Sequence, residues 1–163
     1  MSCKRPRTIV IGIGNPDRGD DAAGPAALAR LRGRLAPGIE LIENNGEATA
    51  LLALLEDAVE VYMIDACRSG RPPGTLHRID ALAHTLPPDG SECSTHGLGV
   101  AQGLELARVL GLLPPRCVVY LIEGESYEPG APLSAAVCTA VASLAERLIA
   151  ELEPSPHRRH RPA

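Results

Sequence analysis

Acidic residues are concentrated in the segment GIGNPDRGDDAAGP, residues 12–25, directly after a short apolar run. A phosphate-binding loop presents backbone N–H groups to an anion, and Asp17, Asp20 and Asp21 would repel that anion. The glycine spacing of a dinucleotide-binding loop also fails, because Asp17 stands where the third glycine is needed. The segment therefore predicts a site for a cation, or for a group that carries one, with helix capping as the structural alternative.

Two further polar residues stand where they can complete such a site. Asp65 closes the apolar segment VYMID, and His96 lies in the segment that opens a predicted helix. In sheets of parallel strands, ligand sites collect beyond the carboxyl ends of the strands, so we expect Asp21, Asp65 and His96 to meet there. The positive end of the helix dipole disfavours imidazolium and keeps a ring nitrogen of His96 available for coordination. Two carboxylates and an imidazole suit a borderline divalent cation such as nickel or zinc.

Each of these residues also has a purely structural interpretation. Asp20 is better explained as an N-cap than as a ligand. Asp65 can bond the backbone N–H groups that follow it, and a histidine such as His96, taken alone, is more often structural. Cys67 and Cys93 are interpreted as small buried hydrophobic residues outside the site.

Apolar runs alternate with helical patterns along the whole chain. The runs predict strands at residues 8–14, 38–44, 59–66, 74–80 and 116–124. Apolar residues at helical spacing predict helices at about 24–35, 47–58, 94–111 and 133–153. This alternation predicts an α/β fold, a three-layer αβα sandwich with a mostly parallel central sheet. We expect one domain over residues 1–152 and a flexible tail over 153–163.

Charge and composition argue against nucleic-acid and membrane partners. The formal net charge is -4 and the chain has no tryptophan or phenylalanine, so it lacks the basic face and stacking platform that nucleic acids need. No segment approaches the roughly 18 to 20 apolar residues of a membrane span. The basic start has too short an apolar run for a signal peptide, and five cysteines without a CxxC pair indicate a reducing compartment. We therefore expect a cytoplasmic protein. Its small size and negative net charge fit a monomer that meets its partner transiently.

Four segments in order, spanning about residues 8 to 150, resemble those of the hydrogenase maturation endopeptidases: VIGIGNPDRGDDAAGP, VYMIDACRSGRPPGTLHRID, STHGLGVAQGLELARVLGLLP and IEGESYEPGAPLSAAV. The resemblance implies a phosphorylase/hydrolase-like fold and an aspartic-type peptidase. Its substrate would be the large-subunit precursor of a nickel–iron hydrogenase, which loses a C-terminal extension after nickel insertion. Asp21, Asp65 and His96 would contact the nickel carried by that substrate, with no organic cofactor. The segment EGESYEP differs from the GIEP type found in some members.

The ligand types of this set determine how it would interact with nickel that is already bound to a substrate. It lacks thiolates, so it can contact nickel without removing the ion from a site made of cysteines, and cleavage then depends on metal loading. Either a carboxylate or the metal can activate the water. Neither GxSxG nor HExxH occurs in the chain. Two alternatives remain: a non-catalytic nickel or zinc carrier that uses the same three residues, and a peptidyl-tRNA hydrolase, which shares only GIGNP.

Overall fold

A sheet runs through the centre of the molecule, as the computed structural model shows for the residues it describes, 7–86 and 97–154. In this part of the chain five strands pair in the order β2-β1-β3-β5-β4. All neighbouring strands are parallel except β4, which is antiparallel to β5 at one edge. The strands are β1 (Thr8–Ile13), β2 (Ile39–Asn44), β3 (Glu60–Cys67), β4 (Leu76–Asp80) and β5 (Arg116–Glu123).

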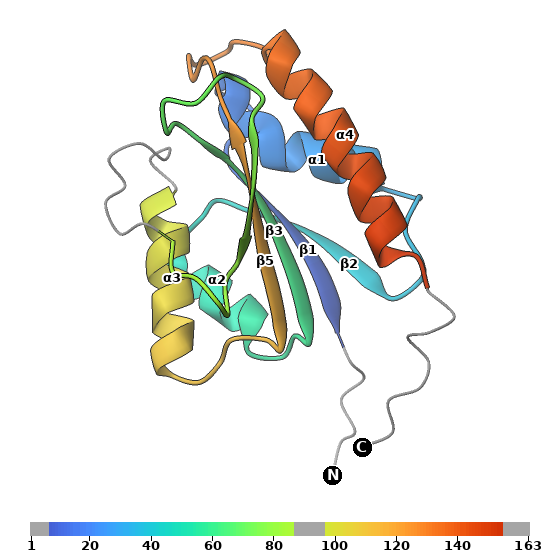
Figure 1. Ribbon diagram of the computed structural model, residues 1–163, viewed down its shortest axis with the longest axis vertical. Helices are drawn as coiled ribbons and strands as arrows, with labels where there is room; N and C mark the ends of the chain where they lie inside the picture. Colours follow the sequence, from blue (N-terminus) through green and yellow to red (C-terminus); the bar gives the residue numbers. More distant parts are fainter. Residues whose placement is uncertain (1–6, 87–96, 155–163) are drawn as a thin grey trace.

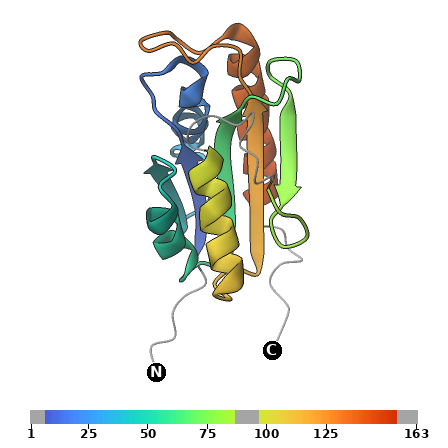
Figure 2. The ribbon, with the colours of Figure 1, turned by 90° about the vertical axis from the view of Figure 1, so that its left-hand side faces the viewer.

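Helices cover both faces of this sheet (Figure 1). On one face α1 (Ala23–Leu31) packs against α4 (Ala135–Leu152), and on the other α2 (Ala48–Leu55) packs against α3 (Gly97–Val109). Figure 2 shows α2 and α3 in front of the sheet. The three-layer αβα prediction is therefore confirmed. No helix in the described ranges has the length and apolar composition that crossing a membrane requires.

The central strands are apolar on both sides because each side meets a helical layer. In β1, Ile9 and Ile11 lie in the core under α2 and α3, whereas Val10 lies in the core under α1 and α4. The edge strands β2 and β4 are only half-buried. The half-polar pattern that the sequence shows at β4 is thus the pattern of an edge strand.

Two boundaries that bear on the site differ from the prediction, and two further predicted segments are not tested. The first helix ends at Leu31 and not near residue 35, because Gly33 follows with a φ of 73°, a backbone conformation outside the helical range. Strand β3 continues to Cys67, so Asp65 lies inside the strand and not at its tip. The predicted start of the third helix, residues 94–96, and residues 155–163 of the predicted tail lie outside the described residues.

Candidate functional site

The carboxyl ends of the parallel strands, at the upper end of the sheet in Figure 1, carry the acidic side chains that the sequence singles out. Asp21 lies in η1 (Gly19–Ala22), a short 3-10 helix that joins β1 to α1 and packs against β3. Asp65 lies on β3 itself. Asp21 is 2% exposed and Asp65 is fully buried. The structure thus brings both carboxylates to the end of the sheet at which the parallel strands finish, away from bulk water. We call this end the carboxyl edge of the sheet.

The loop after β1 fixes the position of Asp21. The Asn15 N–H donates to Asp21 Oδ2 at 3.0 Å, so the side chain folds back over the loop. Gly14 has a φ of 133°, and a Cβ at this position would lie 1.9 Å from the backbone oxygen of Asp21. Only glycine permits this close approach, which explains the glycine that the GIGN segment places before Asn15.

Asp65 is held by the strand that carries it. Its neighbours at alternate positions, Met63 and Cys67, belong to the core under α2 and α3, so the Asp65 side chain points to the same face. Its Oδ1 accepts a hydrogen bond from the Ala66 N–H at 2.8 Å. A buried carboxylate is costly to keep ionised, so it needs polar contacts such as this one.

His96, the third predicted site residue, lies outside the described residues. The helix that follows it, α3, begins at Gly97. Gly99 in the first turn of α3 contacts the loop after β2, since a Cβ at Gly99 would lie 2.1 Å from the Gly46 oxygen. The described start of α3 is therefore at the same edge of the sheet as Asp21 and Asp65.

Asp20 has a different role from the predicted N-cap. Neither η1 nor α1 has a side-chain cap. The Asp20 carboxylate instead reaches across to the segment before α4, residues 125–134. It accepts hydrogen bonds from the N–H groups of Glu125, Ser126 and Ser134 and from the Ser134 hydroxyl, at 2.7 to 3.1 Å. Asp20 therefore ties two loops together at the edge that carries Asp21.

A second polar cluster at this edge was not predicted from the sequence. Glu123, the last residue of β5, is 1% exposed. Its carboxylate accepts hydrogen bonds from the Ser69 N–H at 2.5 Å, the Ser69 hydroxyl at 2.8 Å and the Cys67 thiol at 3.2 Å. His77 Nε2 lies 3.4 Å from Glu123 Oε2. Burial alone would raise the pKa of Glu123, but the hydrogen bonds from Ser69, Cys67 and His77 outweigh it and lower that pKa.

One signal in the sequence pointed to this cluster. Glu123 lies at the end of an apolar strand, and Asp65 lies near the end of another. A carboxylate in such a position is held rigidly by the sheet. The sequence predicts Cys67 to be a small buried hydrophobic residue, and it is buried, but its thiol also donates to Glu123.

Tyr127 links the segment after β5 back to β3. Its hydroxyl donates to the backbone oxygen of Cys67 at 2.7 Å, and the Arg68 guanidinium lies 4.7 Å from the centre of its ring. Burial raises the pKa of the Tyr127 hydroxyl, which therefore remains a donor at neutral pH. Three separate contacts, from Asp20, Glu123 and Tyr127, thus hold the loops at this edge.

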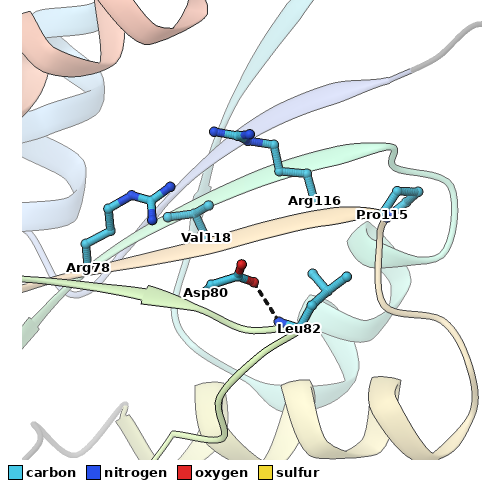
Figure 3. Close-up of a pocket in the computed structure, with 6 residues that line it drawn as sticks. All are labelled: Arg78, Asp80, Leu82, Pro115, Arg116 and Val118. Carbon is cyan, nitrogen blue, oxygen red and sulfur yellow. Dashed lines mark hydrogen bonds between the residues drawn. The ribbon is translucent and has the colours of Figure 1, made fainter. Parts of the chain in front are cut away.

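A pocket at the opposite end of the sheet has no part in this site (Figure 3). Its charged groups already have partners within the fold: Arg116 lies 2.5 Å from Glu151, and Asp80 accepts a hydrogen bond from the Leu82 N–H. The residues that line it are Arg78, Asp80, Leu82, Pro115, Arg116 and Val118.

Comparisons with known proteins agree on one family. A family model described as hydrogenase maturation protease, HycI, matches residues 28–151, which include Asp65 and His96 but not Asp21. The hydrogenase expression/formation protein HoxM of Cupriavidus necator is 28% identical over 122 residues, 74% of this chain and 60% of HoxM. HupD of Thiocapsa roseopersicina is 27% identical over 111 residues, 67% of this chain. The chain spans 60% and 50% of the length of these two relatives.

Solved structures show the same fold. The hydrogenase maturating endopeptidase HybD from E. coli superimposes with a TM-score of 0.76 at 25% identity, covering 92% of this chain and 94% of HybD. The hydrogenase maturation protease HycI from Thermococcus kodakarensis superimposes with a TM-score of 0.70 at 24% identity, covering 90% and 92% of the two chains. The sheet and helices described above are therefore the scaffold of these proteases.

Proposed function

The chain belongs to the hydrogenase maturation protease family, and from this premise we propose that it removes the C-terminal extension of a nickel-loaded hydrogenase large-subunit precursor. The observation that carries the proposal is the pair of buried carboxylates, Asp21 and Asp65, at the carboxyl edge of a sheet with this family's fold. We assign to them, together with His96, contact with the nickel of the substrate.

The ligand types explain how the enzyme can contact nickel without removing the ion from the cysteines of the substrate. Two carboxylates and an imidazole bind a borderline cation less tightly than a group of thiolates does. Nickel held by substrate cysteines would therefore stay there while Asp21, Asp65 and His96 complete its contacts. This docking would hold the nearby peptide bond in one place, which lowers the entropic part of the barrier to hydrolysis. A precursor without nickel would lack the anchor.

Hydrolysis also needs an activated water. An ionised carboxylate of the pair can take a proton from the attacking water and later return it to the leaving amine. Alternatively, the nickel of the substrate can polarise the scissile carbonyl. Both routes depend on the pair, because the first takes its base from Asp21 or Asp65 and the second uses both residues as the contacts that bring nickel to the bond.

Family membership favours a protease over the two alternatives. A non-catalytic nickel or zinc carrier would use the same three residues but would leave the precursor at its full length. A peptidyl-tRNA hydrolase would need a basic surface, and the net charge of this chain is -4. We further propose that the protein acts in the cytoplasm as a monomer that meets its substrate transiently.

The test is to incubate the purified protein with the same precursor in nickel-loaded and nickel-free forms and to weigh the products by mass spectrometry. The nickel-loaded precursor should lose one C-terminal peptide, and the nickel-free precursor should keep its full mass. Loss of the peptide from both forms would contradict the role of nickel. An unchanged mass of the loaded precursor, together with tight binding of nickel by this protein, would favour the carrier.

A further inference from the structure

We propose that Cys67, His77 and Glu123 form a second metal site, specific for a borderline divalent cation such as zinc or cobalt. The three side chains come from three neighbouring strands, β3, β4 and β5. Their ligand atoms all lie within 4.8 Å of one another. None of its three residues is among those assigned to the nickel of the substrate, although Cys67 lies two residues after Asp65 on β3, and the proposal does not rest on the protease function.

Strand register explains why the three side chains meet. Cys67 pairs with Glu123 in the parallel ladder of β3 and β5. His77 pairs with Leu121, two residues before Glu123, in the antiparallel ladder of β4 and β5. Paired residues, and residues two apart on one strand, point to the same face of a sheet, so all three side chains project from one face. The sheet holds them in place whether or not an ion is bound.

Two of the three ligand-atom distances fit one tetrahedral ion, and the third, from Cys67 Sγ to His77 Nε2, is no longer than 4.8 Å and would shorten on binding. Bond lengths of about 2.3 Å to sulfur and 2.0 to 2.2 Å to nitrogen and oxygen place neighbouring ligand atoms about 3.3 to 3.6 Å apart. In the structure, Cys67 Sγ lies 3.2 Å from Glu123 Oε2, and His77 Nε2 lies 3.4 Å from the same oxygen. The side chains therefore need to move by only a few tenths of an ångström in these two contacts.

The hydrogen bonds around Glu123 orient its Oε2 toward the position that an ion would occupy. The Ser69 N–H holds Oε1, while the donors from Cys67, His77 and the Ser69 hydroxyl all converge on Oε2. A ligand whose other oxygen is fixed by a hydrogen bond is oriented for coordination. On binding, the Cys67 thiol would lose its proton to solvent and His77 would carry its ring proton on Nδ1, so that the thiolate, the Nε2 of the neutral imidazole and the carboxylate would hold the ion.

Ligand chemistry and access select the class of metal. A thiolate and an imidazole favour zinc, cobalt or nickel, whereas magnesium and calcium prefer oxygen ligands alone. Cys67 and Glu123 are buried, but the His77 side chain is 31% exposed on the edge strand, which provides a path for entry. Three protein ligands leave a fourth position for water. A bound ion would join β3, β4 and β5 and should raise the unfolding temperature.

Cobalt(II) chloride is the probe for this site, because a cobalt–thiolate bond gives a charge-transfer absorption band in the near ultraviolet. The wild-type protein, purified and stripped with a chelator, should bind one equivalent and show the band. Cys67→Ser should abolish the band. His77→Gln should weaken cobalt binding by at least about tenfold, and so should Glu123→Gln. Zinc chloride should displace the cobalt and raise the unfolding temperature of the wild type.

Matched controls separate this site from other thiols and from the proposed nickel contacts. Cys138→Ser removes an exposed cysteine of α4, and Cys93→Ser removes the cysteine closest in sequence to His96. Both variants, and Asp21→Asn, should keep the cobalt band. Circular dichroism would show that each variant folds, and if Glu123→Gln does not fold, His77→Gln on the half-exposed strand still tests the site. A wild type without the band, or a band lost in Cys93→Ser and kept in Cys67→Ser, would overturn the proposal.

Discussion

Asp20 Oδ2 and the Ser134 hydroxyl lie 2.9 Å apart, although the two residues are separated by 114 positions in the sequence. Ser134 is also the N-cap of α4, where its hydroxyl oxygen accepts a hydrogen bond from the Val137 N–H. One buried carboxylate therefore connects the loop after β1 with the start of the last helix. Because Asp21 is the next residue, this contact also helps to hold the proposed site in place.

Asp20→Ala should lower the free energy of unfolding by about 3 kcal/mol, because it leaves several part-buried N–H donors without their acceptor. The donors affected are those of Glu125, Ser126 and Ser134. Urea unfolding followed by circular dichroism would measure the loss. Asp17→Ala, at an exposed aspartate of the same loop, is the control and should change stability by no more than about 0.5 kcal/mol. Equal losses in the two variants would contradict the anchoring role of Asp20.

Asp21→Asn and Asp65→Asn should each reduce trimming of the nickel-loaded precursor by at least about 100-fold. Asparagine keeps the shape of the side chain but removes the negative charge that binds nickel or accepts a proton. The rate is measured from the masses of the precursor and product over time, and thermal unfolding shows whether the variant is folded. Asp17→Asn should cut at the wild-type rate. If both Asp21→Asn and Asp65→Asn, although folded, also cut at that rate, the site assignment is wrong.

Gly14→Ala should destabilise the protein by about 2 kcal/mol and reduce trimming, because alanine is strained at this positive φ. Its Cβ would also collide with the Asp21 backbone and displace η1. Gly38→Ala is a matched control, since Gly38 also has a positive φ, of 94°, but has open space around the position of a Cβ. That variant should lose some stability and keep its cutting rate. A normal rate in Gly14→Ala would show that Asp21 does not need this loop geometry.

Glu123 should stabilise the protein above about pH 4.3, the ordinary pKa of glutamate, and less in more acidic solution. Its pKa is lowered in the folded state, so the stabilisation is present above the unfolded-state pKa and is lost as pH falls through the folded-state pKa. The difference in unfolding free energy between the wild type and Glu123→Gln should therefore shrink as pH falls from 7 to 3, measured by urea unfolding with a chelator present.

Ser69→Ala provides a graded comparison for that measurement. It removes the hydroxyl that donates to Glu123 but keeps the backbone N–H, so its effect should have the same direction and be smaller. A difference between wild type and Glu123→Gln that grows toward acidic pH would contradict the lowered pKa.

The three tyrosines of the chain, Tyr62, Tyr120 and Tyr127, should not ionise near pH 10 while the protein is folded. Burial is the main cause of the raised pKa of each hydroxyl. Their contribution to stability is therefore present below about pH 10 and is lost as pH rises above it. Ultraviolet absorbance of tyrosinate would follow the titration, and the urea-unfolded protein should ionise near pH 10. A tyrosine that ionises there in the folded protein would contradict this expectation.

Local patterns in the sequence determined most of the fold. Strands such as residues 8–13 are recognisable because a run of β-branched residues fits a strand that is covered on both faces. The acidic loop after that strand and the buried acid on β3 were also visible, because parallel strands place the residues near their carboxyl ends at one edge. Hydrophobic periodicity depends only on residues that are near one another along the chain. The strands, the acidic loop and the acid on β3 could therefore be predicted without knowledge of long-range contacts.

Tertiary structure alone decided which distant residues became partners. Asp20 looked like an N-cap, but the return of the chain before α4 made it the acceptor for Ser134. Cys67, His77 and Glu123 have no common spacing in the sequence, and only the register of β3 and β4 against β5, which lies between them, places them on one face. The hydrogen-bond partners of a buried acid depend on how whole strands pair and how long loops close. The residues next to that acid in the sequence do not determine either.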